Sequence, residues 1–205
     1  MIYWIVQTCS KIFFGLGFGL KAYGLENIPK EGGFLLGANH ASFFDPPAIG
    51  CPLPRQICYF ARKTLFKGLF AWLLPRLKTI PVDREGDSDV SALKRVFKEL
   101  KNGEGLILFP EGTRTENGEL QPAQRGVGMI ACRSQVPVVP VRIYGSYEAL
   151  NRTAKKPSWG QKITVVYDKP MLPEDYDPGK ADKGRYLTAA QRIMERITAL
   201  ENPRG

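Results

Sequence analysis

The order of apolar and polar positions along the chain predicts strands that alternate with helices. Short apolar runs bounded by turn-forming residues are typical of buried strands. Such runs cover residues 34–38, 56–61, 105–110, 136–145 and 162–168, and a shorter strand is expected within 21–33. The run at 136–145 contains two prolines, which cannot donate to a ladder, so an irregular or edge position is expected for it.

Helices are predicted where apolar residues recur at helical spacing. The clearest one lies within 88–103, where Gly103 occupies the expected C-terminal cap. Its apolar face is expected to consist of Val90, Leu93, Val96, Phe97 and Leu100. A helix is also expected at DPPAIG, with Asp45 as the N-cap and Pro46 in the first helical position. The remaining predicted helices cover 66–78, 126–134 and about 182–201.

This alternation predicts an α/β fold, with a single domain in which a central mixed sheet is flanked by helices. A chain of 205 residues without internal repeats or a long polar linker fits one domain. We expect that domain to cover residues 21–205, and residues 1–20 to form an apolar, membrane-associating segment.

Residues 1–20 differ from the rest of the chain because they carry a single charge, Lys11. A spanning helix needs about 20 apolar residues, so the length is barely sufficient, and Gln7, Thr8 and Ser10 interrupt the run. A signal peptide is not favoured, since no Lys or Arg precedes the run and no small-residue cleavage site follows it. Two interpretations stay open, a buried first helix and a membrane contact. The aromatic residues favour the second.

The charge balance favours anionic partners. Lys and Arg outnumber Asp and Glu by 29 to 20, a net charge of +9, as expected for binding nucleic acid, anionic lipid or phosphorylated small molecules. Nucleic acid is the least favoured, because the positive charge is dispersed and no helix-turn-helix or RNP-type motif is present. The four cysteines form no C-x-x-C pair and there is one histidine, so no metal site is expected. Scattered cysteines are typical of reduced thiols in a cytosolic compartment.

The stretch NHASFFD contains the only histidine, His40, and ends at Asp45. On a continuous helix, a separation of five residues would point the two side chains about 140° apart. A turn before the predicted helix lets them converge at the end of a strand, where α/β folds place ligands. The pair is then a general base with its orienting carboxylate, or a structural histidine near a helix cap. By itself the motif favours the structural interpretation.

A second motif, FPEGTRT at 109–115, directly follows a buried strand. Gly112 permits close approach of the backbone to a ligand, Thr113 offers a hydroxyl, and Arg114 offers a planar donor group for phosphate oxygens. Glu111 is expected to orient the arginine or to accept a hydroxyl from a substrate. The same residues are also ordinary turn formers, so the motif alone does not decide for a phosphate site.

The order of these motifs resembles that of a known family. NHASFFD, then IPVDR ending at Arg84, then FPEGTR and VPVVPV occur at a spacing similar to that of the glycerophospholipid acyltransferases, above all the bacterial 1-acylglycerol-3-phosphate acyltransferases. The resemblance covers roughly residues 20–145 and implies that His40 is the general base and Asp45 assists it. The family's phosphate-binding positions map onto Arg84, Glu111, Gly112, Thr113 and Arg114. One departure is Arg125, in PAQRG, where many members have a lysine.

The resemblance implies an enzyme of phospholipid biosynthesis. It would move a fatty acyl group from acyl-CoA or acyl-carrier protein to the free hydroxyl of 1-acylglycerol-3-phosphate, giving phosphatidic acid. The thioester is a co-substrate, and neither a cofactor nor a metal is expected. Lipid substrates imply a peripheral or monotopic protein on the cytoplasmic face of the cytoplasmic membrane, with residues 1–20 and 66–78 as contacts.

Two alternatives stay open at this point. In the first, the chain is an acyltransferase whose acceptor is another lysophospholipid, glycerol-3-phosphate or an aminolipid. In the second, the chain is a membrane lipid-binding module without catalysis. The intact His40 and Asp45 disfavour the module, because a protein that only binds lipid does not need a base.

Overall fold

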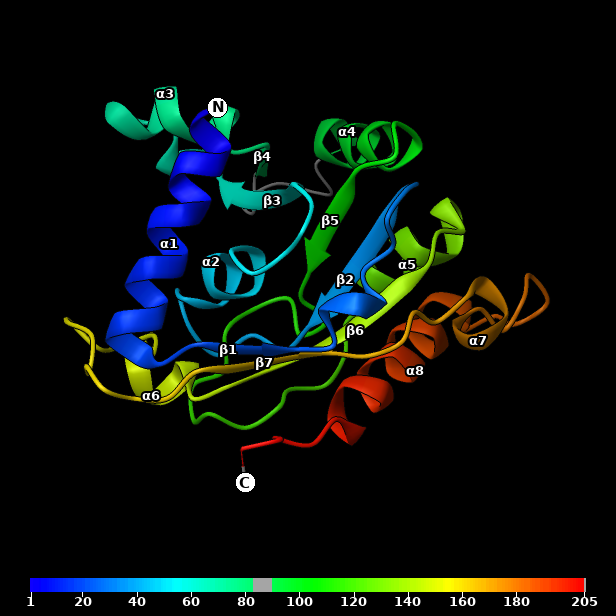
Figure 1. Cartoon of the computed structure of the whole chain (residues 1–205). Coiled ribbons are helices and arrows are strands. Elements are labelled where there is room, and N and C mark those ends of the chain that lie inside the picture. Colours follow the sequence, from blue (N-terminus) through cyan, green and yellow to red (C-terminus); the bar gives the residue numbers. More distant parts are fainter. Residues whose placement is uncertain (83–89, 205) are drawn as a thin grey trace.

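The apolar runs of the sequence fold into a mixed sheet that helices cover on both faces (Figure 1). The computed structural model describes residues 1–82 and 90–204. Within them, the strands are β1 (Lys21–Tyr23), β2 (Phe34–Ala38), β3 (Ile57–Arg62), β4 (Thr79–Val82), β5 (Gly105–Leu108), β6 (Val138–Tyr144) and β7 (Thr164–Tyr167). They are ordered β1-β7-β6-β2-β5-β3-β4, and every neighbouring pair is parallel except β6 and β7. The predicted α/β domain with a mixed sheet is confirmed.

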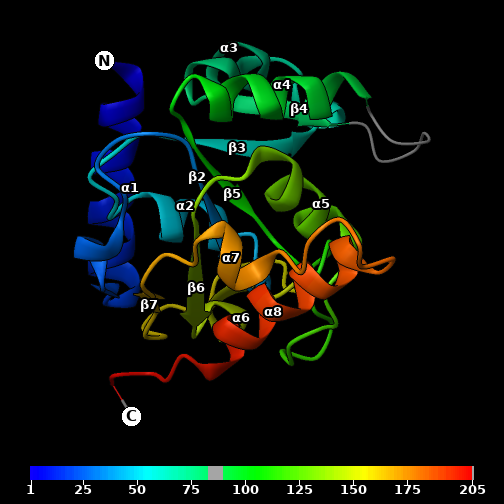
Figure 2. The same cartoon turned by 90° about the vertical axis from the view of Figure 1, so that its right-hand side faces the viewer.

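Helices from different parts of the chain form the two outer layers (Figure 2). The α-helices are α1 (Ile2–Phe18), α2 (Asp45–Gly50), α3 (Leu69–Arg76), α4 (Val90–Lys101), α5 (Arg125–Ser134), α6 (Ser146–Leu150), α7 (Pro173–Tyr176) and α8 (Arg185–Ala199), and the short 3-10 helices are η1 (Leu25–Asn27) and η2 (Lys63–Leu65). One core lies between the sheet and α1, α2 and α6, and the other between the sheet and α4, α5, α7 and α8. Strand β2 serves both, because Phe34 and Leu36 face the first core and Leu35 faces the second.

One local prediction was wrong, and another held in only one of its two alternatives. Asp45 is not the N-cap of α2 but its first residue, and Phe44 occupies the cap position without a side-chain cap bond. Of the two alternatives predicted for β6, an irregular or an edge position, the edge is excluded, because β6 lies inside the sheet between β7 and β2. The ladder beside Pro140 is irregular, because the register between Val141 and Tyr167 shifts by one residue at the bridge between Val138 and Met171. Pro140 has no N–H to donate there, but its carbonyl accepts from Asp168 N.

Helix α4 forms where it was predicted, but its buried stripe is rotated. Ala92, Val96 and Leu100, spaced four residues apart, are buried, whereas Val90 is 56% exposed. Small Ala92 allows close approach to the sheet, which the pattern of large apolar residues did not reveal. Gly103 follows the helix with φ of 86°, the left-handed conformation expected after a helix end.

The N-terminal segment forms α1, which lies along α2 on the left of Figure 1. One side of α1 is buried through Tyr3, Gln7, Phe14 and Phe18. The amide of Gln7 donates to the carbonyl of Leu53 at 2.9 Å, which fixes the helix at its middle. Within residues 1–82 and 90–204, no helix combines the length and the apolar character that crossing a bilayer requires.

Candidate active site

The two sequence motifs meet at one edge of the sheet. NHASFFD begins directly after β2, and FPEGTR begins directly after β5. These strands are parallel neighbours, with Gly37 paired to Leu108, so their carboxyl ends lie side by side. This edge is where open α/β sheets bind their ligands.

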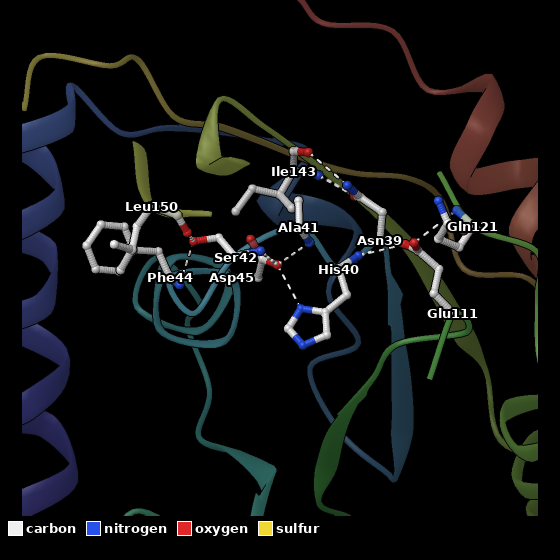
Figure 3. Close-up of polar contacts among 10 residues, drawn as sticks. All are labelled: Asn39, His40, Ala41, Ser42, Phe44, Asp45, Glu111, Gln121, Ile143 and Leu150. Atoms are coloured by element: carbon white, nitrogen blue, oxygen red, sulfur yellow. Dashed lines mark hydrogen bonds and ion pairs between the residues drawn. The ribbon is translucent and has the colours of Figure 1, made fainter. Parts of the chain in front are cut away.

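His40 and Asp45 are hydrogen-bonded to each other at the start of α2 (Figure 3). His40 Nδ1 lies 2.8 Å from Asp45 Oδ2. The turn between β2 and α2 brings the side chains together, which a continuous helix would have kept apart. Because an ionised carboxylate only accepts, Nδ1 carries the proton and Nε2 keeps its lone pair, the state that a general base needs. The histidine side chain is 13% exposed, so it is reachable, whereas Asp45 is fully buried.

Asp45 also holds the turn that carries the histidine. Its Oδ2 accepts from the backbone N–H of Ala41 at 2.6 Å and of Ser42 at 2.7 Å, in addition to the imidazole. Three donors therefore converge on one carboxylate oxygen. The aspartate thus fixes both the tautomer of the imidazole and the backbone on which it stands.

Two further polar residues of the motif anchor it to the domain, and the sequence analysis did not assign them a part. Asn39 makes two bonds to the backbone of Ile143 in β6, donating to its carbonyl at 3.1 Å and accepting from its N–H at 2.8 Å. Ser42 donates from Oγ to the carbonyl of Leu150 at the end of α6. The only available signal was the presence of small polar residues beside the histidine, which is too common in turns to be informative.

Glu111 connects the two motifs. Its Oε1 accepts from the backbone N–H of His40 at 2.7 Å, and its Oε2 accepts from the backbone N–H of Gln121 at 3.0 Å. The residue is 3% exposed, and this burial raises the pKa of its carboxyl, while the two N–H groups act in the opposite direction. Glu111 was expected to contact the substrate or Arg114. Both of its oxygens instead bind backbone N–H groups of the chain, one of them that of His40.

The imidazole is also held from its flat side. The ring of Phe109 stacks on that of His40 with centroids 3.9 Å apart and planes 15° from parallel. Thr115 N donates to the carbonyl of His40 at 2.9 Å, a second link between the two loops. Side chain and backbone of the histidine are both fixed by the loop that follows β5, as catalytic preorganisation requires.

A polar cavity of about 450 Å³ opens beside the FPEGTR loop. It is lined by Thr113, Arg114, Thr115, Glu116, Asn117, Gln121 and Arg152. The guanidinium of Arg114 lies 3.4 Å over the ring of Phe43, which orients it. Gly112 adopts φ of 71°, so glycine is suited to this turn. Arg152 is distant in sequence and was not predicted, and Arg84 lies outside the described residues.

An apolar cavity of about 210 Å³ adjoins the start of α2. Pro46 and Pro47, which directly follow Asp45, form part of its wall, and α1, β3 and α3 supply most of the rest. Tyr3 and Tyr59, whose hydroxyl oxygens are 3.3 Å apart, also line it. The site therefore has a cation-bearing polar cavity near FPEGTR and an apolar cavity near the N-terminal end of α2.

The model of the Acyltransferase family matches residues 19–144, more than half of the chain. The chain belongs to this family. The match contains both motifs described above, so the resemblance inferred from their order is confirmed. In the part of the chain that the structure describes, this acyltransferase has no cluster of three or more His, Cys, Asp or Glu side chains that could hold a metal ion.

Within this family, the chain is similar to relatives, one of them with a solved structure, that are named as acyltransferases of 1-acylglycerol-3-phosphate. It is 31% identical to the 1-acyl-sn-glycerol-3-phosphate acyltransferase of Bacillus subtilis over 98% of both chains. It is 32% identical to a chloroplastic 1-acyl-sn-glycerol-3-phosphate acyltransferase of Brassica napus, of which it spans 44%. The crystal structure of the 1-acyl-sn-glycerophosphate (LPA) acyltransferase of Thermotoga maritima superimposes with a TM-score of 0.76, at 27% identity, covering 98% of this chain and 81% of that one.

Proposed function

We propose that this chain transfers an acyl group from an acyl thioester to the free hydroxyl of 1-acylglycerol-3-phosphate, giving phosphatidic acid. The observation that carries the proposal is the His40–Asp45 pair, held at 2.8 Å, with Pro46 of an apolar cavity next to Asp45 in the chain and Thr115 of a cation-bearing cavity bonded to the His40 backbone. A phosphate and an acyl chain are the two parts of this acceptor, and the two cavities have the matching chemistry. The names of the Bacillus subtilis and Thermotoga maritima relatives support the same substrate.

The proposed mechanism is general-base catalysis without a covalent enzyme intermediate. Nε2 of His40 takes the proton of the acceptor hydroxyl while its oxygen attacks the thioester carbonyl. The imidazolium that forms is stabilised by the buried carboxylate of Asp45. When the tetrahedral intermediate collapses, the carbon–sulfur bond breaks and the thiolate leaves as a thiol with the proton returned by His40. The route needs no cofactor, and the donor is acyl-CoA or acyl-carrier protein.

Binding of the acceptor phosphate is assigned to Arg114 with Gly112 and Thr113, and to Arg84. Arg114 and Thr113 line the polar cavity, so they are placed to hold a phosphate while the hydroxyl reaches His40. Glu111 takes the part of a positioning residue, because its oxygens bind the backbone of the two loops.

The same proposal includes association with the cytoplasmic face of the cytoplasmic membrane, where a lipid acceptor lies. Supporting it, α1 exposes Ile5, Ile12 and Leu16, and α3 exposes Leu69, Phe70 and Trp72 next to cationic residues. Solvent-exposed apolar side chains in such number on two neighbouring helices favour contact with lipid. The net charge of +9 suits an anionic leaflet.

The test is acyl transfer from labelled acyl-CoA and from acyl-carrier protein to 1-acylglycerol-3-phosphate, for wild type and for His40→Ala. Wild type should form phosphatidic acid, and the variant, with an unchanged circular dichroism spectrum, should lose about 10³-fold or more in turnover. Wild-type turnover by the variant contradicts the base assignment. Turnover only with glycerol-3-phosphate, another lysophospholipid or an aminolipid contradicts the acceptor, and lipid binding without any turnover favours a binding module.

A further inference from the structure

The segment that joins α6 to β7, residues 151–162 (NRTAKKPSWGQK), is unusual in its charge and in its exposed aromatic ring. It contains four cations, Arg152, Lys155, Lys156 and Lys162, and no acidic residue. All four are exposed, and Trp159 between them is 63% exposed. The proposed reaction uses neither the lysines nor the tryptophan.

Trp159 is held firmly although most of it is exposed. Its ring stacks on Phe18 at the end of α1, with centroids 5.2 Å apart and planes 23° from parallel, and meets Phe13 edge-on at 5.6 Å. The backbone N–H of Gly160 donates to the carbonyl of Gly17 at 3.0 Å. A Cβ on Gly17 would lie 2.7 Å from the Trp159 ring, so glycine at that position permits the packing. The segment is thus fixed to the C-terminal end of α1.

The helix that holds Trp159 also has an exposed apolar side. Ile5, Ile12 and Leu16 are 55%, 56% and 86% exposed, and their spacing of seven and four residues puts them on one stripe. This stripe lies opposite the buried residues of the helix. In Figure 1 the segment, drawn in yellow, and α3 both project on the side of the molecule where α1 lies, one near each end of the helix.

We propose that residues 151–162 form a second lipid contact, in which Trp159 enters the headgroup region of a bilayer and Lys155, Lys156 and Lys162 bind the phosphates of anionic lipids. The inference rests on the proposed membrane association of α1. A lipid surface fits better than an acidic protein, because cations flank an exposed ring that is held at the end of α1, a helix with an exposed apolar stripe, as in interfacial segments.

The position of the segment also gives the contact a consequence for the site. Arg152, near its start, lines the same polar cavity as Arg114 and pairs with Glu116 at 3.2 Å. Seating Trp159 among headgroups therefore brings the opening of this cavity to the level at which lipid phosphates lie. The segment orients the enzyme so that an acceptor enters without leaving the bilayer surface.

The experiment measures binding to phosphatidylcholine vesicles with and without phosphatidylglycerol by cosedimentation. Trp159→Ala should lower affinity for the anionic vesicles about tenfold. Lys155→Ser with Lys156→Ser should lower it about 25-fold, since each lysine near an anionic surface contributes about fivefold, and should reduce its salt dependence. The matched control is Lys180→Ser with Lys183→Ser, which removes the same charge from exposed positions between α7 and α8 on the opposite side of Figure 1, and should change affinity less than twofold.

A second measurement covers the case in which a variant folds poorly. In the chain with Trp4→Phe and Trp72→Phe, Trp159 is the remaining tryptophan, and lipids brominated on their acyl chains should quench its fluorescence. Unquenched fluorescence with vesicles bound overturns the proposal. An equal loss of vesicle affinity in the Lys180 and Lys183 control also overturns the proposal. So does a result in which Lys155 and Lys156 bind acidic acyl-carrier protein and not vesicles. Vesicle binding requires no turnover, so failure of the proposed reaction is recognised separately, as absent product with binding intact.

Discussion

Two regions of this acyltransferase differ in whether their side chains have partners within the chain. Around His40, the polar groups of the turn are bonded within the chain, so that Asp45 accepts three N–H donors and Glu111 accepts two from backbone. On the outer side of α1, large apolar groups such as Leu16, 86% exposed, contact no core. The polar side chains of the first region bind within the chain, whereas the apolar side chains of the second face solvent.

The difference separates preorganisation from association. Buried polar groups that make several hydrogen bonds hold one geometry, which a reaction centre needs, and losing one partner leaves others unsatisfied. Exposed apolar groups add little to folding, so their presence is explained by a surface that covers them elsewhere. The predictions below test each half of this comparison, beginning with the largest expected effect.

Asp45→Asn should cause the largest loss of activity, about 10³–10⁴-fold in kcat. An amide is neutral, so it neither fixes the required tautomer of His40 nor stabilises the imidazolium, and its NH2 group cannot accept from Ala41 and Ser42. Steady-state kinetics with thermal unfolding of the same samples provides the measurement. Activity within tenfold of wild type in a folded variant would mean that the ion pair is structural.

Two residues of α1 make a matched pair for stability. Phe14 is 2% exposed in the first core, and Phe14→Ala should lower the free energy of unfolding by about 3–5 kcal/mol. Leu16→Ala, two residues away on the exposed side, should change it by less than about 0.5 kcal/mol. Urea unfolding measures both. Vesicle affinity, compared at the same folded fraction, should show the opposite order, with Leu16→Ala binding more weakly than Phe14→Ala. Equal vesicle affinities would contradict the assignment of the exposed stripe to lipid.

Glu111→Gln should lower kcat about 10- to 100-fold with the KM for the acceptor within about twofold, because it loosens the backbone of His40 without touching substrate. Glu119→Gln, an exposed change on the same loop, is the control and should leave both constants near wild type. A rise in acceptor KM with kcat retained would return Glu111 to the substrate-binding part expected from the family pattern.

The smallest expected effect is a pH dependence of stability from the same carboxyl. Burial raises the pKa of Glu111 in the folded chain, so the folded state takes up this proton at higher pH than the unfolded state does. The resulting stabilisation is present below the pKa of the unfolded chain and is lost as pH rises through the folded pKa. Wild type should therefore exceed Glu111→Gln in stability by more at about pH 4 than at about pH 7. Urea titrations at the two pH values measure the difference, and an equal difference at both would contradict it.

The sequence by itself determined the class of fold, the family and the identity of both motifs. Apolar runs such as 34–38 and helical spacing such as that of α8 are local properties, and local burial patterns decide strand or helix. The His40–Asp45 and FPEGTR signatures are likewise contiguous, so they were recognisable without knowing which strands are neighbours. Their catalytic and binding roles stay predictions.

Only the tertiary structure decided what lies next to what. Strand order placed β6 inside the sheet despite Pro140, and a short turn joined His40 to Asp45 across five residues. The bond from His40 N to Glu111 and the contact of Trp159 with Phe18 join residues 71 and 141 positions apart, respectively. Such contacts depend on how strands pair and how helices pack, and the pattern along a single stretch of chain carries no information about either.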